Sequence, residues 1–229
     1  MKKLTDKIIF DFLNCLFTDD MDGIWIDTDG ESFSFCSERL GSEELSGTAM
    51  GIDYKVAMGA TKICFILDDY DAVIKMPVTG TYATYYNEEI GIDCCEIIED
   101  NDMDDIETEI DKYRAASPAM KEFLLPNCFI GVVRDIPVYK QEAVKETFYS
   151  FITDNANNPK YKDDSFKLAC EYRDEGIGIN LPLIFVSSII ETQPLFKNIL
   201  SEVVSITDIH NENIGYTYAG KAVCFDYAM

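Results

Sequence analysis

Apolar residues recur at helical spacing near the start of the chain. One side of a helix over residues 5–17 carries Ile8, Ile9, Phe12, Leu13 and Leu16. The Thr5-Asp6 pair in front of them is a typical helix-capping signal. The pattern therefore predicts that an amphipathic helix opens the fold.

Strand patterns follow this helix. Residues 23–27 and 32–36, separated by the turn sequence Thr-Asp-Gly-Glu, predict a hairpin. After a loop of small residues, alternating apolar stretches with turn residues between them predict three successive antiparallel strands at 52–58, 62–67 and 72–76.

A second helix is predicted over about 104–115. The acidic stretch from Glu99 in front of it carries too much charge to pack, and is expected to be a solvated approach to the helix. The apolar stripe of this helix consists of Ile106, Ile110 and Tyr113. Glu109 falls on the inner flank of that stripe, whereas Glu107 and Asp111 point outward. One carboxylate is therefore aimed at the core.

The remaining pattern changes character along the chain. Two more strands are predicted at 128–133 and 136–144, helices near 145–153, 165–175, 182–190 and 192–204, and a closing hairpin at 214–225 that turns at Ala219-Gly220. A strand-rich half followed by a helix-rich half predicts an α+β, two-lobed arrangement with a crossing near residues 141–144. The length of 229 residues suits one compact unit or two small lobes.

The charge of the chain excludes some partners. Nineteen basic and 42 acidic residues give a formal net charge of −23, which repels nucleic-acid backbones and anionic lipids over a Debye length of about 10 Å. We therefore expect no direct nucleic-acid binding and no membrane partner. The charge either keeps the protein soluble or imitates nucleic acid toward a basic protein partner.

The cysteines and the N-terminus favour a cytoplasmic location. Most of the eight cysteines lie inside apolar runs without metal-ligand spacing, which is typical of reduced core thiols. The first apolar stretch is short and broken by Asp11, unlike a signal peptide, and no run reaches the ~20 apolar residues of a membrane span.

The candidate chemistry lies near the end of the sequence. Asp208, His210 (the only histidine) and Asn213 share one loop, and Asp226 follows the closing hairpin. Oxygen ligands at the two ends of one hairpin can hold a hard cation such as Mg²⁺, while a further carboxylate on the loop accepts a proton.

This loop resembles the D-x-H-x-x-N catalytic loop of the protein-kinase-like phosphotransferases. The spacing from Asp208 to Asn213 and on to Asp226 is similar to that in protein kinases, where the last acid opens the Asp-Phe-Gly motif. Here the motif reads Asp226-Tyr227-Ala228, so two of its three residues differ.

The resemblance extends to the strand-rich half. Lys75 is similar to the strand lysine of the kinase Val-Ala-Ile-Lys motif, and Glu109 corresponds to the helical glutamate that pairs with it. In place of a glycine-rich loop the sequence offers Gly59, with Thr61 as a polar substitute for contacting phosphate.

The resemblance implies a set of roles. ATP would lie with its adenine along the backbone from Gln141 to Ala143, and Lys75, held by Glu109, would bind its phosphates. Asn213 and Asp226 would bind Mg²⁺. Asp208 would orient the acceptor hydroxyl and take its proton, which leaves His210 a structural role in the loop.

The resemblance also implies domains and a function. Residues 1–50 would form an N-terminal extension, 51–143 a strand-rich kinase-like N-lobe and 144–229 a reduced, minimal helical C-lobe. The expected function is a small atypical protein kinase that phosphorylates hydroxyl groups on a protein. The alternative is a non-catalytic acidic protein on the same scaffold that inhibits a basic or nucleic-acid-binding host protein. Size and charge resemble bacteriophage accessory proteins, which act in the host cytoplasm.

Overall fold

The computed structural model describes residues 1–17, 23–27, 33–34, 46–59, 61–100, 104–159 and 213–227. The chain divides into two compact units. Unit 1 comprises Met1–Glu107 and Asn127–Ala143, and unit 2 comprises Thr108–Pro126 and Val144–Met229. The predicted α+β class is confirmed, while the kinase-like lobes and their boundaries stay predictions.

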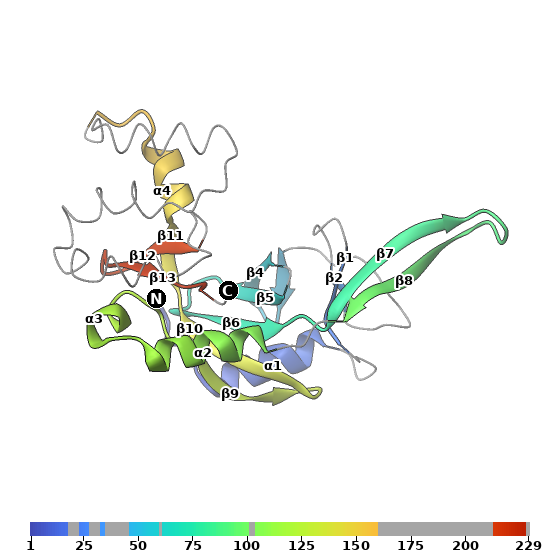
Figure 1. Ribbon diagram of the computed structural model, residues 1–229, viewed down its shortest axis with the longest axis horizontal. Helices are drawn as coiled ribbons and strands as arrows, with labels where there is room; N and C mark the ends of the chain where they lie inside the picture. Colours follow the sequence, from blue (N-terminus) through green and yellow to red (C-terminus); the bar gives the residue numbers. More distant parts are fainter. Residues whose placement is uncertain are drawn as a thin grey trace. The chain divides into compact units, whose positions relative to one another are not determined.

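A six-stranded antiparallel sheet forms the centre of unit 1 (Figure 1). Its spatial order is β3 (Ser46–Ala49), β4 (Ile52–Met58), β5 (Lys62–Leu67), β6 (Ala72–Pro77), β10 (Ile136–Glu142) and β9 (Cys128–Val133). The prediction of three successive antiparallel strands is confirmed by β4, β5 and β6. The two strands predicted after residue 127 are confirmed as β9 and β10.

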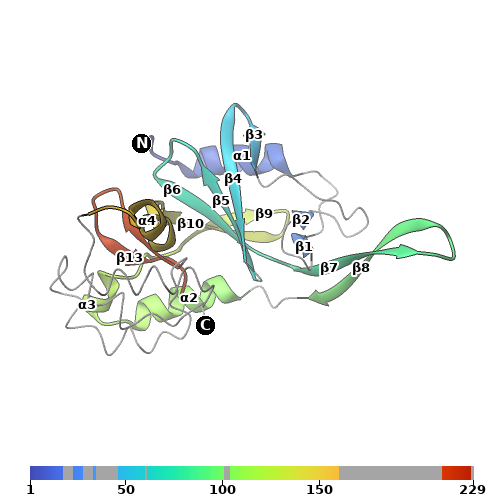
Figure 2. The same cartoon turned by 90° about the horizontal axis from the view of Figure 1, so that it is seen from above.

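Helix α1 (Asp6–Leu16) packs on one face of this sheet, as Figure 2 shows from above. Its predicted apolar stripe is confirmed, because Ile9, Phe12 and Leu13 are fully buried in the same core as Phe65 of β5. The ring of Phe12 meets the ring of Phe65 edge to face, with centroids 6.0 Å apart. The helix is thus an integral part of the core of unit 1.

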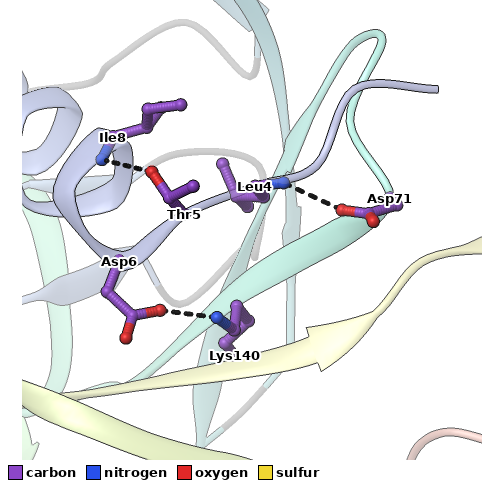
Figure 3. Close-up of polar contacts among 6 residues, drawn as sticks. All are labelled: Leu4, Thr5, Asp6, Ile8, Asp71 and Lys140. Atoms are coloured by element: carbon purple, nitrogen blue, oxygen red, sulfur yellow. Dashed lines mark hydrogen bonds and ion pairs between the residues drawn. The ribbon is translucent and has the colours of Figure 1, made fainter.

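Polar contacts fix the start of α1 (Figure 3). The Thr5 hydroxyl accepts a hydrogen bond from the Ile8 N–H at 3.4 Å, as the capping signal predicts. The Leu4 N–H donates to the Asp71 carboxylate at 2.9 Å, and the Lys140 ammonium contacts the Asp6 carboxylate at 2.5 Å. These contacts join the N-terminal segment to the turn before β6 and to β10.

A second sheet of unit 1 has the order β2 (Phe33–Ser34), β1 (Trp25–Asp27), β7 (Gly80–Asn87) and β8 (Ile92–Asp100). The antiparallel pair β1–β2 confirms the predicted early hairpin. The sequence reasoning missed β7 and β8. It also assigned residues 99–100 to a solvated approach, whereas they end β8. Within unit 1, β7 and β8 form a ribbon that extends beyond the other elements in both views (Figures 1 and 2).

Unit 2 contains a three-stranded antiparallel sheet and short helices. The sheet has the order β11 (Val144–Thr147), β12 (Ile214–Thr217) and β13 (Ala222–Cys224). The helices are α2 (Asp105–Ala115), which belongs to this unit from Thr108 on, α3 (Pro118–Lys121) and α4 (Phe148–Asn155). Helix α2 and the closing hairpin confirm two predictions, and α3 was not foreseen.

The predicted helix at 145–153 is wrong in its first turn. Residues 144–147 form β11, which pairs with β12, and α4 begins only at Phe148 behind the Thr147 cap. The predicted helices at 165–175, 182–190 and 192–204 lie outside the described residues. Among the residues that the structure describes, no helix has the length and apolar character needed to cross a bilayer.

Candidate functional site

Two candidate site residues of unit 1, Lys75 and Gln141, lie on the face of the six-stranded sheet opposite to α1. Residues directly across neighbouring strands share a face, and Lys75 of β6 lies between Cys64 of β5 and Tyr139 of β10. Val73 is two residues before Lys75 on β6, so its side chain points to the same face. Val73 lies across from Gln141 of β10. The structure therefore brings Lys75 and Gln141 together on one face of two paired strands.

The side chains of Lys75 and Gln141 are removed from water. Lys75 and Gln141 are each only 2% exposed. An ammonium is costly to remove from water, so a buried lysine in the middle of a strand is unusual for a purely structural position. Buried ionisable groups gather at functional sites, which makes this face a candidate for binding an anion.

Tyr139 adds a further polar group to this face. Its hydroxyl donates a hydrogen bond to the Glu107 carboxylate at 3.3 Å. Burial, followed by the charge of Glu107 and this hydrogen bond, raises the pKa of Tyr139 from 10.0 to about 12. Tyr139 is therefore a neutral donor at any physiological pH. The sequence reasoning missed it, although its place opposite Lys75 follows from the pairing of β6 with β10.

The backbone amides predicted to contact ATP have internal partners. The Gly59 N–H donates to the Lys62 carbonyl at 2.9 Å in the turn between β4 and β5. The Ala143 N–H donates to the Asp71 carbonyl at 2.9 Å. The Thr61 carbonyl accepts from the Val78 N–H at 2.9 Å. These bonds limit the ways in which this backbone can meet a nucleotide.

Glu109 is the most deeply buried acid among the described residues of unit 2. It is 0% exposed on α2, as its predicted position on the inner flank requires, whereas Glu107 and Asp111 are exposed. Burial first, and then the charges of Glu109 and other neighbours including Asp226, raise the pKa of Tyr227 well above its usual range. Glu109 therefore lies within electrostatic range of the segment that follows β13.

This C-terminal segment is held by several hydrogen bonds. The Tyr227 hydroxyl donates to the Leu125 carbonyl at 2.8 Å, and the Lys112 ammonium donates to the Tyr227 carbonyl at 3.1 Å. The strand before it is anchored too, since the Leu125 N–H donates to the Cys224 carbonyl at 2.9 Å. The sequence reasoning noted Tyr227 only as a departure from phenylalanine, but its aromatic ring is fully buried.

Asn213 and Asp226 meet at the open end of the β12–β13 hairpin. Ile214 lies across from Cys224, and the Phe225 N–H donates to the Asn213 carbonyl at 2.9 Å. The Asn213 side chain is buried and that of Asp226 is half-buried. Both residues therefore lie at the open end of one hairpin, and their side-chain oxygens are the kind of donor that Mg²⁺ takes when water or phosphate oxygens complete its coordination. In the described part of the chain, no three His, Cys, Asp or Glu side chains gather as a metal site on their own.

The remaining predicted residues cannot be located. Asp208, the predicted proton acceptor, and His210 lie outside the described residues. The structure therefore brings together Lys75 with Gln141 in unit 1, and Glu109, Asn213 and Asp226 around one C-terminal segment in unit 2.

Comparison with known proteins gives no assignment: no protein-family model and no curated protein matches this chain.

Proposed function

We propose that this protein is an ATP- and Mg²⁺-dependent phosphotransferase, a small atypical protein kinase that transfers phosphate to a hydroxyl group of a protein. In this proposal Lys75 binds the nucleotide phosphates, and Asn213 and Asp226 hold the metal. Asp208 accepts the proton of the attacking hydroxyl. The metal, when bound, neutralises charge on the phosphates; the chain's own residues position them.

The observation that carries the proposal is the convergence of Asn213 and Asp226 on the open end of one hairpin. The sequence places these two residues thirteen positions apart, and only the pairing of β12 with β13 makes them neighbours. Lys75 and Glu109 add support because both are buried ionisable residues, and such residues gather at functional sites.

The test is incubation of the purified protein with radiolabelled ATP, with and without Mg²⁺ and with and without a cell lysate. We expect Lys75→Ala and Asp226→Ala each to abolish phosphate transfer while unfolding remains cooperative. Each loss removes positioning or charge stabilisation that the reaction needs. Matched controls are Lys55→Ala and Asp154→Ala, which remove exposed charges elsewhere. Full activity in Asp226→Ala would contradict the metal assignment.

A second candidate function is favoured by the net charge of −23. A non-catalytic protein with this charge could bind and inhibit a basic or nucleic-acid-binding protein of its host. Such a protein needs neither ATP nor Mg²⁺, and its complex should dissociate as salt rises. Mg²⁺-dependent ATP binding by equilibrium dialysis separates the two functions before any substrate is known.

A further inference from the structure

The ribbon formed by β7 and β8 carries an unusual concentration of exposed apolar side chains. Among the described residues, six of the thirteen large apolar side chains that are exposed lie on it: Tyr85, Tyr86, Ile90, Ile92, Ile97 and Ile98. Isolated exposed apolar residues are common, but a contiguous group of them marks an interaction surface.

The apolar side chains lie on both faces of the ribbon. Tyr86 shares one face with Ile97, whereas Tyr85 and Ile92 share the other, as the strand register requires. β1 pairs with β7 only over Gly80–Tyr82, and beyond Tyr82 no other strand of the described residues joins either edge. This outer part is therefore a two-stranded structure with little core of its own.

The tip of the ribbon is closed by a turn with its own hydrogen bonds. At its tip, Gly91 has a φ of 69°, in the left-handed region that glycine favours. The Gly91 N–H donates to the Asn87 carbonyl at 2.8 Å, and the Glu89 N–H donates to the Asn87 side chain at 3.0 Å. These bonds close the hairpin at its tip without the exposed Tyr and Ile side chains.

The charge of the ribbon indicates which partner it fits. Residues 80–100 contain no lysine or arginine, and their six acids are Glu88, Glu89, Asp93, Glu96, Glu99 and Asp100. A second copy of the chain would bring the same acids together, and each copy carries a net charge of −23. A surface with lysine or arginine around apolar side chains would complement both features.

We propose that the β7–β8 ribbon is a docking arm for a basic protein surface that also presents apolar side chains. The tyrosine and isoleucine side chains supply the buried contact area, and the carboxylates supply attraction and orientation. This role does not depend on phosphate transfer, because none of the proposed ATP or metal residues belongs to the ribbon.

The test uses arrayed synthetic peptides in which lysine or arginine alternates with isoleucine, leucine or tyrosine. Two matched arrays replace the basic residues by glutamate or the apolar residues by serine. We expect the protein to bind only the array that is both basic and apolar, and to bind it less tightly as salt rises. Tyr86→Ser, Ile98→Ser and Glu88→Lys should each weaken binding by about tenfold, which corresponds to about 1.4 kcal/mol. The controls Tyr218→Ser, Phe129→Ser and Asp154→Lys change equally exposed residues elsewhere and should bind as the parent does.

Other outcomes overturn the proposal. No binding, equal binding to all three arrays, or binding that the ribbon variants leave unchanged would each exclude the docking arm. Self-association in light scattering that Tyr86→Ser abolishes would identify a second copy as the occupant. A lower melting temperature of Tyr86→Ser, with Tyr218→Ser unchanged, would mean that the chain's own residues cover the ribbon.

Discussion

At the residue scale, the phenol groups of Tyr139 and Tyr227 show how burial and nearby acids act together. Each hydroxyl donates to an oxygen, of Glu107 and Leu125 respectively, and each has a raised pKa, mainly because burial disfavours the phenolate. Both tyrosines are therefore neutral donors that hold their surroundings in one arrangement.

For Tyr227, removal of the hydroxyl should destabilise the fold. Tyr227→Phe loses the hydrogen bond to the Leu125 carbonyl inside the protein, and we expect a loss of about 1–2 kcal/mol in the free energy of unfolding. The measurement is denaturant unfolding. Tyr218→Phe, at an exposed tyrosine, is the control and should stay within about 0.5 kcal/mol of the parent. Equal stabilities for the two variants would show that the bond contributes nothing.

For Tyr139, the raised pKa makes stability depend on alkaline pH. The unfolded chain loses this proton near pH 10 and the folded chain at about pH 12. The stabilisation that this pKa difference gives to the folded state is thus complete below pH 10 and disappears as pH rises through 12. We expect the parent to lose more stability than Tyr139→Phe across this window, as measured by unfolding at a series of pH values. If the unfolding free energies of the two proteins changed in parallel with pH, the raised pKa of Tyr139 would be contradicted.

At the element scale, α1 shows that the N-terminal segment belongs to the core of unit 1. Three of its side chains are fully buried against the sheet, and polar contacts hold its first turn (Figure 3). The ion pair between Lys140 and Asp6 is partly exposed and contributes little. The apolar contacts therefore dominate the attachment of the helix.

Truncation of a buried ring on α1 should be severe. Phe12→Ala leaves a cavity between α1 and β5, next to Tyr54 and Phe65, and we expect a loss of about 3–5 kcal/mol in unfolding free energy. Tyr149→Ala, at an exposed aromatic residue of α4, is the matched control. A loss below about 1 kcal/mol in Phe12→Ala, measured by denaturant unfolding, would mean that α1 is not part of the cooperative core.

Elements with a strong local pattern could be predicted from the sequence, and those set by distant pairing could not. α1, α2, β4–β6, β9, β10 and the closing hairpin follow local periodicity. Residues 145–147 have a helical pattern, but they form a strand because they pair with β12, about seventy residues further along the chain. No element was predicted for residues 80–98, and the acids from Glu99 on were assigned to solvated chain, whereas residues 99–100 end β8. A two-stranded ribbon can expose both faces, so it can carry such acids.

The candidate site was predictable to a similar extent. Helical phase was enough to identify Glu109 as buried, and hairpin pairing was enough to bring Asn213 near Asp226. The role of Tyr139 depends on the register between β6 and β10, which a single sequence does not specify. The hydrogen bonds that occupy the Gly59 and Ala143 amides likewise arise from turn geometry rather than residue type.

At the scale of the whole molecule, the net charge of −23 opposes folding through self-repulsion. The described ion pairs between Lys55 and Asp68 and between Arg114 and Asp111 lie at the surface, where such pairs contribute little. The fold therefore depends on its apolar core and hydrogen bonds.

Added salt should stabilise this protein. Screening weakens repulsion among the excess carboxylates, and we expect the melting temperature to rise by about 2–4 °C between low and moderate salt, equivalent to about 1 kcal/mol. Differential scanning calorimetry in sodium chloride gives the measurement. Sodium sulfate at equal ionic strength separates screening from salt-specific effects on apolar burial. A constant or falling melting temperature would show that repulsion is not significant.

The bonds of Asp71 have a practical consequence for handling the protein. Its carboxylate holds the Leu4 N–H, its own N–H donates to the Lys2 carbonyl, and its carbonyl holds the Ala143 N–H. Removing the first four residues would remove the bonds that Asp71 makes to Leu4 and Lys2. The remaining partner of Asp71, Ala143, follows the end of β10 and is two positions from Gln141. Expression of the protein should therefore keep residues 1–4 intact, because Lys2 and Leu4 both bond to Asp71.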